Sequence, residues 1–342
     1  MSLVVVDADV LGRRRTGDET YVRNLLRTLP APATAAGLRV AAVTRRPDLV
    51  PEGVEPLRLG TSSQELRMAW SLPRLLRRAG ASLVHTQYAV PLRAPCPAVV
   101  TIHDLSFEDD AQIGRRDGIV FRRVVPRAAR AAARVLTVSE RTRQDLVRRY
   151  ALDPDHVVVT PNGVDPVFAA GAHAREHTLD GPYVLAVGAI QPRKNQRAAL
   201  AAASAAGLDF VLVGPTKDEA VARELRDGGA RLQGYVSDER LAGLYRGAAC
   251  LVQASRHEGF GLPVIEAMAS GTPVVTVPDE ALVEVAGDAA IVVPEDELAD
   301  GIRRALADRE RLAAAGRERA RAFSWEATAE ATVRVYVEAL GR

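Results

Sequence analysis

The sequence predicts an α/β protein built from two doubly wound parallel-sheet domains. Three observations support this fold class. The chain has 342 residues, which exceeds the size at which a single hydrophobic core usually divides. Apolar runs with strand character alternate with amphipathic helical stretches, and after a break near residue 168 the alternation begins again. Such alternation favours parallel sheets that are covered by helices on both faces.

In the first half, short apolar runs bounded by turn residues are the predicted strands. They are Leu3–Val10, Arg39–Thr44, Ser82–His85, Ala98–His103, Arg134–Val138 and Val157–Thr160. Segments with helical periodicity lie between them. These predicted helices are Glu19–Leu29, Gln64–Arg78, Val120–Ala133 and Arg141–Tyr150. We expect this domain to span residues 1–168 and a linker to follow over 169–180.

The second half repeats the pattern. The predicted strands are Tyr183–Val187, Phe210–Val213, Ala230–Gln233, Cys250–Gln253, Pro273–Val277 and Ala290–Val293. The predicted helices begin at Asn195 and cover Asp218–Arg226, Asp238–Gly247 and Pro263–Ala269. We expect this domain to span 181–325. Because open parallel sheets bind ligands beyond the carboxyl ends of their strands, we look for the site in the loops at those ends.

Bulk composition excludes several classes of protein. There is no uninterrupted apolar run of membrane-spanning length and no basic leader before the first strand, so we expect a cytoplasmic protein. The two cysteines, Cys96 and Cys250, form no metal or disulfide pattern. Residues 1–166 carry 25 arginines and 18 acidic residues, a net charge of +7. A basic half can favour an anionic acceptor or the inner face of a membrane, but arginines scattered over a solvated surface are the simpler explanation. No nucleic-acid partner is expected.

The run from His257 to Val275 is the most informative segment. Glu258, Gly259, Phe260, Gly261 and Leu262 form a glycine-rich loop that leads into a helix with Pro263 in its first turn. Such a loop can present backbone N–H groups to an anion or to sugar hydroxyls. Glu258 in the loop and Glu266 in the helix can accept hydrogen bonds from different parts of one long ligand. The alternative is a plain surface loop with two solvated glutamates.

A second candidate site lies in the segment Val187–Asn195, at the end of another predicted strand. Gly188 ends the strand, and the cations Arg193 and Lys194 come just before a helix. Fixed cations there would stabilise a departing diphosphate. Lys194 is notable because Lys217 is the only other lysine in the chain. The alternative is a pair of solvated charges.

These motifs resemble the family 4 (group 1) glycosyltransferases of the GT-B fold, in which two Rossmann-like domains face each other across a cleft. The resemblance implies that Glu258 binds hydroxyls of the transferred sugar, that the loop amides bind sugar and phosphate, and that Glu266 binds the ribose. It assigns Arg193 and Lys194 to the donor diphosphate, and Gly188 to the same loop. Many relatives carry arginine directly after this glycine, where this chain has Ala189.

In the first domain, His103 and Asp104 follow a predicted strand. By resemblance, His103 lies near the reacting centre and can hydrogen-bond the transferred sugar or the leaving phosphate, whereas Asp104 belongs to the acceptor side. His85, at the end of the preceding strand, is a further acceptor-side candidate. A histidine at a strand end can also serve local hydrogen bonding alone.

The loop after the first strand offers two interpretations. Thr16 and Glu19 fit a capping box, which needs no ligand. By resemblance, Gly17 lets the backbone approach the donor phosphates or the acceptor. The neighbouring Arg13, Arg14 and Arg15 depart from the usual small-residue loop. They can contact an anionic acceptor, or they are solvated.

Two further segments resemble the same family. Tyr235 and Val236, in the segment Gly234–Glu239, correspond to backbone that meets the nucleobase. The final helix, residues 326–342, corresponds to one that packs back on the first domain. The resemblance therefore extends over essentially the whole chain.

The resemblance implies a retaining hexosyltransferase that uses a nucleotide-diphosphate sugar and acts in polysaccharide biosynthesis of bacterial type. The Pro192–Asn195 tetrad (PRKN) is similar to that of mannosyl- and rhamnosyl-transferring relatives, so GDP-mannose is the first donor to test. We expect no cofactor and no metal, because Arg193 and Lys194 can neutralise the leaving group. The acceptor, a glycan, a lipid-linked sugar or a small molecule, has no motif here. The alternatives are a sugar phosphorylase, an epimerase or a non-catalytic nucleotide-sugar-binding protein; a dinucleotide-dependent oxidoreductase is disfavoured because no G-x-G-x-x-G follows either first strand.

Overall fold

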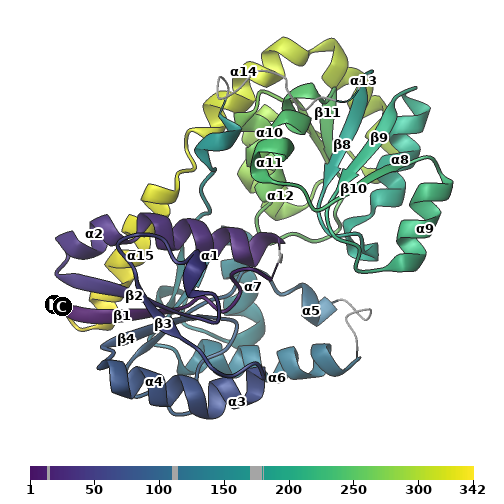
Figure 1. The fold of residues 1–342 in the computed structure, drawn as a ribbon. Helices are drawn as coiled ribbons and strands as arrows, with labels where there is room; N and C mark the ends of the chain where they lie inside the picture. The colour runs from purple at the N-terminus through teal and green to yellow at the C-terminus, as the bar shows by residue number, and fades with distance from the viewer. Residues whose placement is uncertain (14–15, 110–114, 170–178, 180) are drawn as a thin grey trace. The chain divides into compact units, whose positions relative to one another are not determined.

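The computed structural model describes residues 1–13, 16–109, 115–169, 179 and 181–342. The chain forms two compact units (Figure 1), of which unit 1 comprises Met1–Gly163 with Trp325–Arg342, and unit 2 comprises Val164–Ser324. Each unit is built on one parallel sheet flanked by helices, as the sequence predicts. In the described part of the chain, no helix is both long enough and apolar enough to cross a lipid bilayer.

Unit 1 contains a seven-stranded parallel sheet in the order β3-β2-β1-β4-β5-β6-β7. Its strands are β1 (Ser2–Asp7), β2 (Leu38–Thr44), β3 (Glu55–Arg58), β4 (Leu83–Gln87), β5 (Ala98–Thr101), β6 (Arg134–Thr137) and β7 (Val157–Val159). The strand β3 is absent from the prediction. Its residues are mostly exposed and include Pro56, which breaks the apolar pattern but is tolerated because β3 is an edge strand.

The helices of unit 1 cover both faces of this sheet. They are α1 (Thr16–Thr28), α2 (Pro30–Ala35), α3 (Gln64–Leu66), α4 (Leu72–Ala79), α5 (Ser106–Asp109), α6 (Arg115–Ala131), α7 (Glu140–Tyr150) and α15 (Trp325–Ala339). The predicted helix over Gln64–Arg78 is one continuous element in which a π-helical segment, Arg67–Ser71, joins α3 to α4. The strand pattern contains bulky apolar residues such as Val5, Val84 and Val100, which are fully buried beneath these helices.

Unit 2 contains a six-stranded parallel sheet in the order β10-β9-β8-β11-β12-β13. Its strands are β8 (Tyr183–Val187), β9 (Asp209–Val213), β10 (Arg231–Gly234), β11 (Cys250–Gln253), β12 (Val274–Thr276) and β13 (Ile291–Val292). The helices are α8 (Gln196–Ala205), α9 (Glu219–Asp227), α10 (Asp238–Gly247), α11 (Leu262–Ala269), α12 (Glu280–Ala286), α13 (Leu298–Ala307) and α14 (Arg309–Ala320). The last three lie outside the predicted elements.

The boundaries of the units differ from the expected ones at two points. Trp325, which was expected to end the second domain, belongs to unit 1. Residues 164–168, assigned by sequence to the first domain, belong to unit 2. The reason is packing: the ring of Phe168 lies edge-on to Tyr245, with 5.8 Å between centroids, and its carbonyl accepts a hydrogen bond from Ser270. The expected linker, 169–180, falls almost entirely outside the described residues. The last helix, α15, packs within unit 1 against α1 and α2.

Strand order places the functional loops of unit 2. The order of the strands reverses between β8 and β11, which lie side by side with Cys250 opposite Val184 and Leu251 opposite Leu185. Ligands of open parallel sheets bind at such a reversal, because the two loops that leave it diverge toward opposite faces. The loop after β8 contains Arg193 and Lys194, and the loop after β11 contains Glu258.

Candidate functional site

The centre of the unit 2 site is an ion pair between the two neighbouring loops. Lys194 Nζ lies 2.5 Å from Glu258 Oε1, and Arg193 lies 3.6 Å from Glu258 Oε2. Arg193 also donates a hydrogen bond to the carbonyl of His257, and its own carbonyl accepts one from the N–H of Arg256 at 3.1 Å. The structure thus brings together the three residues that the sequence assigned to sugar and diphosphate.

Glu258 is ionised and buried. Burial alone would raise the pKa of its carboxyl, but the positive charges of Lys194 and Arg193 outweigh burial and hold the pKa at about 2. The amide of Gln253 donates to Glu258 Oε1 at 2.7 Å. The carboxylate therefore accepts hydrogen bonds at physiological pH and never acts there as a proton donor.

Three partners of this site escaped the sequence prediction. They are Gln253, Ser255 and Asp279. Gln253 is the last residue of β11 and also donates a hydrogen bond to the Ser255 hydroxyl at 3.0 Å. Asp279 follows β12 and accepts a hydrogen bond from the N–H of Glu258 at 3.4 Å. Gln253 had a detectable signal, because it is a polar residue at the carboxyl end of an apolar strand. Asp279 had none, since it also caps α12 and looks like an ordinary helix start.

The glycine-rich loop packs against its own domain. Gly259, Phe260 and Gly261 are buried, and the ring of Phe260 lies edge-on to Phe323 at 5.7 Å between centroids. Gly261 has φ +106°, and a Cβ there would lie 2.7 Å from Leu282, so both backbone and space require glycine. The half-buried Leu262 begins α11. Among the loop residues of the prediction, it is the least buried.

Glu266 lies on α11 and is buried. Its Oε2 accepts a hydrogen bond from the hydroxyl of Tyr245, on α10, at 2.8 Å. Burial raises the pKa of that hydroxyl well above its usual value, and the negative charge of Glu266 adds to the effect. Tyr245 therefore stays protonated and fixes the Glu266 side chain. It is a positioning residue that no sequence pattern pointed to.

The loop after β8 turns sharply at Gly188, which has φ +143°. A Cβ on Gly188 would make only ordinary van der Waals contact with the Lys194 side chain, at 3.6 Å, so the positive φ and not a lack of space favours glycine here. Ala189 is buried, and its carbonyl accepts a hydrogen bond from Gln196 at 2.9 Å. The position at which relatives carry arginine is thus part of the domain interior here. Tyr235, by contrast, is about half exposed after β10, and Val236 beside it is half-buried.

In unit 1, His103 lies beyond the end of β5 in an aromatic setting. Its ring lies edge-on to Tyr21, 4.7 Å between centroids, and Nε2 is 3.4 Å from the Gln87 amide oxygen. Burial lowers the pKa of the imidazole, although the charges of Asp18 and Asp104 oppose this. Asp104 accepts hydrogen bonds from the backbone and hydroxyl of Ser106, at 3.0 and 2.8 Å, and so begins α5.

His85 has an internal role, which corrects its assignment to the acceptor side. It is 1% exposed, and both ring nitrogens are occupied: Nδ1 lies 2.6 Å from the Tyr336 hydroxyl and Nε2 lies 2.7 Å from the Thr101 hydroxyl. Thr101 in turn lies 3.0 Å from the hydroxyl of Tyr21. This buried chain of polar groups attaches α15 to the sheet of unit 1.

The structure describes part of the loop after β1. Glu19 accepts a hydrogen bond from the N–H of Gly12 at 2.8 Å, and this bond ties the loop to α1. Gly17 lies exposed in the first turn of α1, where a Cβ would meet no described atom. Arg13 pairs with the buried Asp9. Arg14 and Arg15 lie outside the described residues.

Protonation of His85 should weaken unit 1 in mild acid. Burial, reinforced by the neighbouring His103, lowers its pKa to about 3 from an ordinary value of 6.5, so between these values the unfolded chain binds a proton that the folded chain does not. Unfolding free energy then falls with decreasing pH by up to about 1.4 kcal/mol per unit. Urea titrations at pH 7 to 4.5, followed by tryptophan fluorescence, measure this slope, since both tryptophans lie in unit 1.

The matched variant for this prediction is His85→Gln. It is expected to be less stable than the wild type at pH 7, because two buried hydrogen bonds are disturbed. The unfolding free energy of the variant should depend less steeply on pH than that of the wild type. The two plots of unfolding free energy against pH should therefore converge toward pH 4.5. Parallel curves would show that His85 is not the group that titrates.

Comparison with known proteins identifies the family. The family model "Glycosyltransferase Family 4" matches residues 15–168, and the model "Glycosyl transferases group 1" matches residues 172–322. The chain is 31% identical over 265 residues to O-antigen chain mannosyltransferase B of Escherichia coli. The aligned region covers 70% of each protein.

Two solved structures show the same fold over nearly the whole chain. Sucrose-phosphate synthase from Thermosynechococcus elongatus superposes with a TM-score of 0.78 at 24% identity, covering 99% of each chain. HepE from Anabaena, in complex with UDP-glucose, superposes with a TM-score of 0.72 at 16% identity and covers 99% of this chain and 100% of its own. Together with the family matches, these similarities show that the protein is a member of the group 1 glycosyltransferases, with the GT-B fold and glycosyltransferase activity.

Proposed function

We propose that this enzyme transfers a hexose from a nucleotide-diphosphate sugar to a hydroxyl acceptor with retention of anomeric configuration. The observation that carries the proposal is the Lys194–Glu258 ion pair, with Arg193 beside it, at the strand-order reversal of unit 2. It combines a fixed carboxylate, suited to sugar hydroxyls, with two cations suited to a diphosphate. HepE, which shares the fold, has been crystallised with UDP-glucose.

In the proposed step, the bond between C1 of the sugar and the phosphate oxygen breaks. The bond from C1 to the acceptor oxygen forms on the same face of the sugar, and the acceptor proton passes to the departing phosphate oxygen. Lys194 and Arg193 stabilise the negative charge that develops on the diphosphate. This route needs no general base from the protein, and it agrees with the pKa of about 2 for Glu258.

For His103 we propose a hydrogen bond to the transferred sugar or to the leaving phosphate. Its lowered pKa keeps the imidazole neutral near pH 7, so the ring can donate from one nitrogen and accept at the other. The edge contact with Tyr21 fixes its plane. For Glu266, held by Tyr245, we propose ribose binding.

We further propose GDP-mannose as the donor and a glycan or lipid-linked sugar as the acceptor. The support is the similarity to O-antigen chain mannosyltransferase B and the Pro192–Asn195 segment, in which Arg193 and Lys194 come just before α8. No metal takes part in this proposal, since Lys194 and Arg193 supply positive charge. A chelator is therefore expected to leave the transfer rate unchanged; a loss that added Mg²⁺ reverses would contradict this.

Thermal shift with a panel of nucleotide sugars tests the donor assignment. A ligand that binds only the native state raises the melting temperature, and at 100 times its Kd it stabilises by about 2.7 kcal/mol. GDP-mannose is expected to give a larger shift than UDP-glucose, UDP-galactose or ADP-glucose. If a uridine or adenosine diphosphate sugar gave the larger shift in melting temperature, that sugar would be assigned as the donor instead of GDP-mannose. The proposed class of reaction would stay the same. No shift with any nucleotide sugar would overturn the proposed donor site.

A further inference from the structure

Unit 1 exposes a group of large apolar side chains beside arginines. Leu66, Trp70 and Leu92 are 57%, 59% and 52% exposed. The N–H of Leu92 donates to the carbonyl of Met68 at 3.3 Å, so the loop with Leu92 lies directly against the π-helical segment. We call this area the Trp70 surface. It consists of Leu66, Trp70, Arg74, Arg77, Arg78, Leu92 and Arg93.

The helix spacing explains why the helical residues of this surface share one side. Leu66, Trp70 and Arg74 follow one another at intervals of four, which is the neighbour distance on a helix surface. The opposite side carries Met68 and Leu72, which are buried in the core of unit 1. Within the described part of unit 1, the exposed side therefore lies outside the hydrophobic core, although it contains a tryptophan.

The charge of this surface is strongly positive. Between Leu59 and Gly80, the exposed charged residues are Arg74, Arg77, Arg78 and a single acid, Glu65. Arg93 adds a further exposed cation beside Leu92. The guanidinium of Arg74 lies over the Trp70 ring, 4.9 Å from its centroid. Cations and an aromatic ring thus lie side by side, which suits a boundary between water and an apolar phase.

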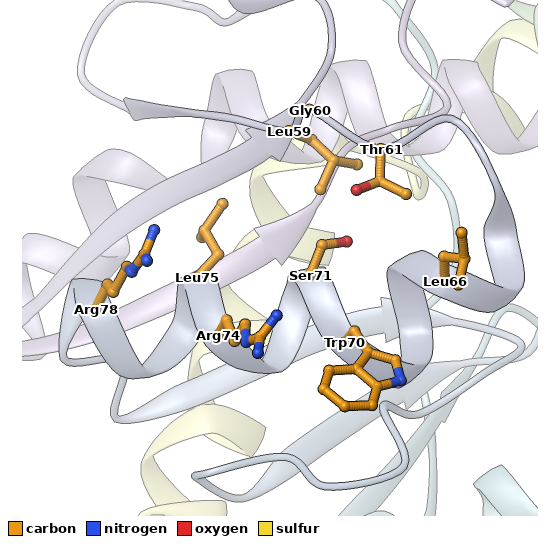
Figure 2. A pocket seen from close by; sticks show the side chains of 9 residues that line it. All are labelled: Leu59, Gly60, Thr61, Leu66, Trp70, Ser71, Arg74, Leu75 and Arg78. Carbon is orange, nitrogen blue, oxygen red and sulfur yellow. The ribbon is translucent and has the colours of Figure 1, made fainter.

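A groove of about 530 Å³ lies next to Trp70, between the helix and the segment that follows β3. Figure 2 shows Leu59 and Thr61 on the strand side, with Ser71, Arg74 and Arg78 along the helix. The Ser71 hydroxyl is buried and has no hydrogen-bond partner among the described residues. The groove thus combines apolar walls with an unused hydroxyl and cations at its rim.

We propose that the Trp70 surface docks unit 1 on an anionic lipid bilayer. Tryptophan and leucine enter the headgroup region, where an amphipathic ring is stabilised, and the arginines contact lipid phosphates. The groove and its Ser71 hydroxyl receive one headgroup. The charge argues for this occupant over a second copy of the chain, because two such surfaces would repel each other. The proposal goes beyond sugar transfer and does not depend on the identity of the donor.

The Trp70 surface lies near the carboxyl edge of the unit 1 sheet. Arg67, within the π-helical segment, pairs with Asp7 at the end of β1 at 2.7 Å, so the segment lies at the carboxyl edge of the unit 1 sheet. The loop with Arg13 leaves the same strand. A bilayer at the Trp70 surface would therefore lie near the candidate acceptor residues, and we infer an acceptor that is carried by a lipid.

Tryptophan fluorescence with vesicles tests the proposal on the whole chain. The only other tryptophan, Trp325, is 1% exposed, so a spectral change reports on Trp70. Vesicles that contain phosphatidylglycerol are expected to shift the emission to shorter wavelength and to sediment the protein, whereas pure phosphatidylcholine vesicles should do neither. High salt should weaken binding. Absence of binding to the anionic vesicles, or equal binding to both kinds, would overturn the proposal.

Variants locate the binding face. The double variant Arg74→Ala/Arg78→Ala should bind anionic vesicles roughly 30-fold more weakly, since each arginine near such a surface accounts for about a fivefold effect. Trp70→Ala should also bind more weakly. The matched control is Arg223→Ala/Arg226→Ala, which removes two exposed charges from α9 of unit 2 and should bind like the wild type. Equal binding by all variants would assign the lipid contact to another face. Circular dichroism verifies that each variant is folded.

Discussion

Lys194→Ala is expected to lower the rate of sugar transfer by on the order of 10²–10³-fold, the usual effect of losing one group that stabilises developing charge. Lys194 Nζ contacts Glu258 at 2.5 Å, and its side chain lies beside the Gly188 turn. Alanine would leave Arg193 as the one remaining cation of this cluster. The measurement is the initial rate of product formation, with the melting temperature recorded to verify the fold.

Lys217→Ala is the matched control for this experiment. It removes the only other lysine, which is exposed in the loop after β9. Its rate should stay within a few-fold of the wild-type rate. Lys194→Arg keeps the charge but not the compact ammonium, and it should recover part of the activity. Wild-type turnover by Lys194→Ala would remove the lysine from the proposed mechanism.

Glu258→Ala is expected to nearly abolish transfer, because it removes the acceptor proposed for the sugar hydroxyls. It also leaves Lys194, Arg193 and Gln253 without their shared partner. Breaking such a buried pair costs on the order of 3 kcal/mol. This is less than the total stability of an ordinary domain, so unit 2 should remain folded at 25 °C.

Glu258→Gln separates charge from shape in the same site. With a carboxyl pKa of about 2, the wild type carries a full negative charge there, and glutamine removes the charge at nearly constant volume. We expect a transfer rate close to that of Glu258→Ala, together with a smaller loss in melting temperature. Full activity in either variant would show that the carboxylate is not needed for donor use.

The fold was predictable because both sheets are parallel and buried on both faces. Strands such as Cys250–Gln253 are then nearly continuous apolar runs. Helix α10, Asp238–Gly247, begins with a serine cap and two acidic residues, which are typical of a helix start. The edge strand β3 was missed because it is short and mostly exposed, has charged residues at both ends and contains Pro56. Its stability comes from pairing with β2, which no local pattern records.

The site residues that were predictable are those whose side-chain chemistry suits the ligand and that also lie in a recognisable motif. Lys194 and Glu258 are 64 positions apart, and only the adjacency of β8 and β11 brings them into contact. His85 shows the opposite case. A polar residue at a strand end looked like a ligand contact, but the fold places Tyr336 of the last helix against it. Sequence separation of 251 residues hides such a partner.

The most direct test of the central claim is release of nucleotide from radiolabelled sugar donors, with and without an acceptor panel, followed by NMR of the product. The proposed mechanism predicts that an acceptor accelerates release, that the product keeps the anomeric configuration of the donor, and that Lys194→Ala and Glu258→Ala lose both release and product. A product of inverted configuration, or unchanged release by these two variants, would contradict it.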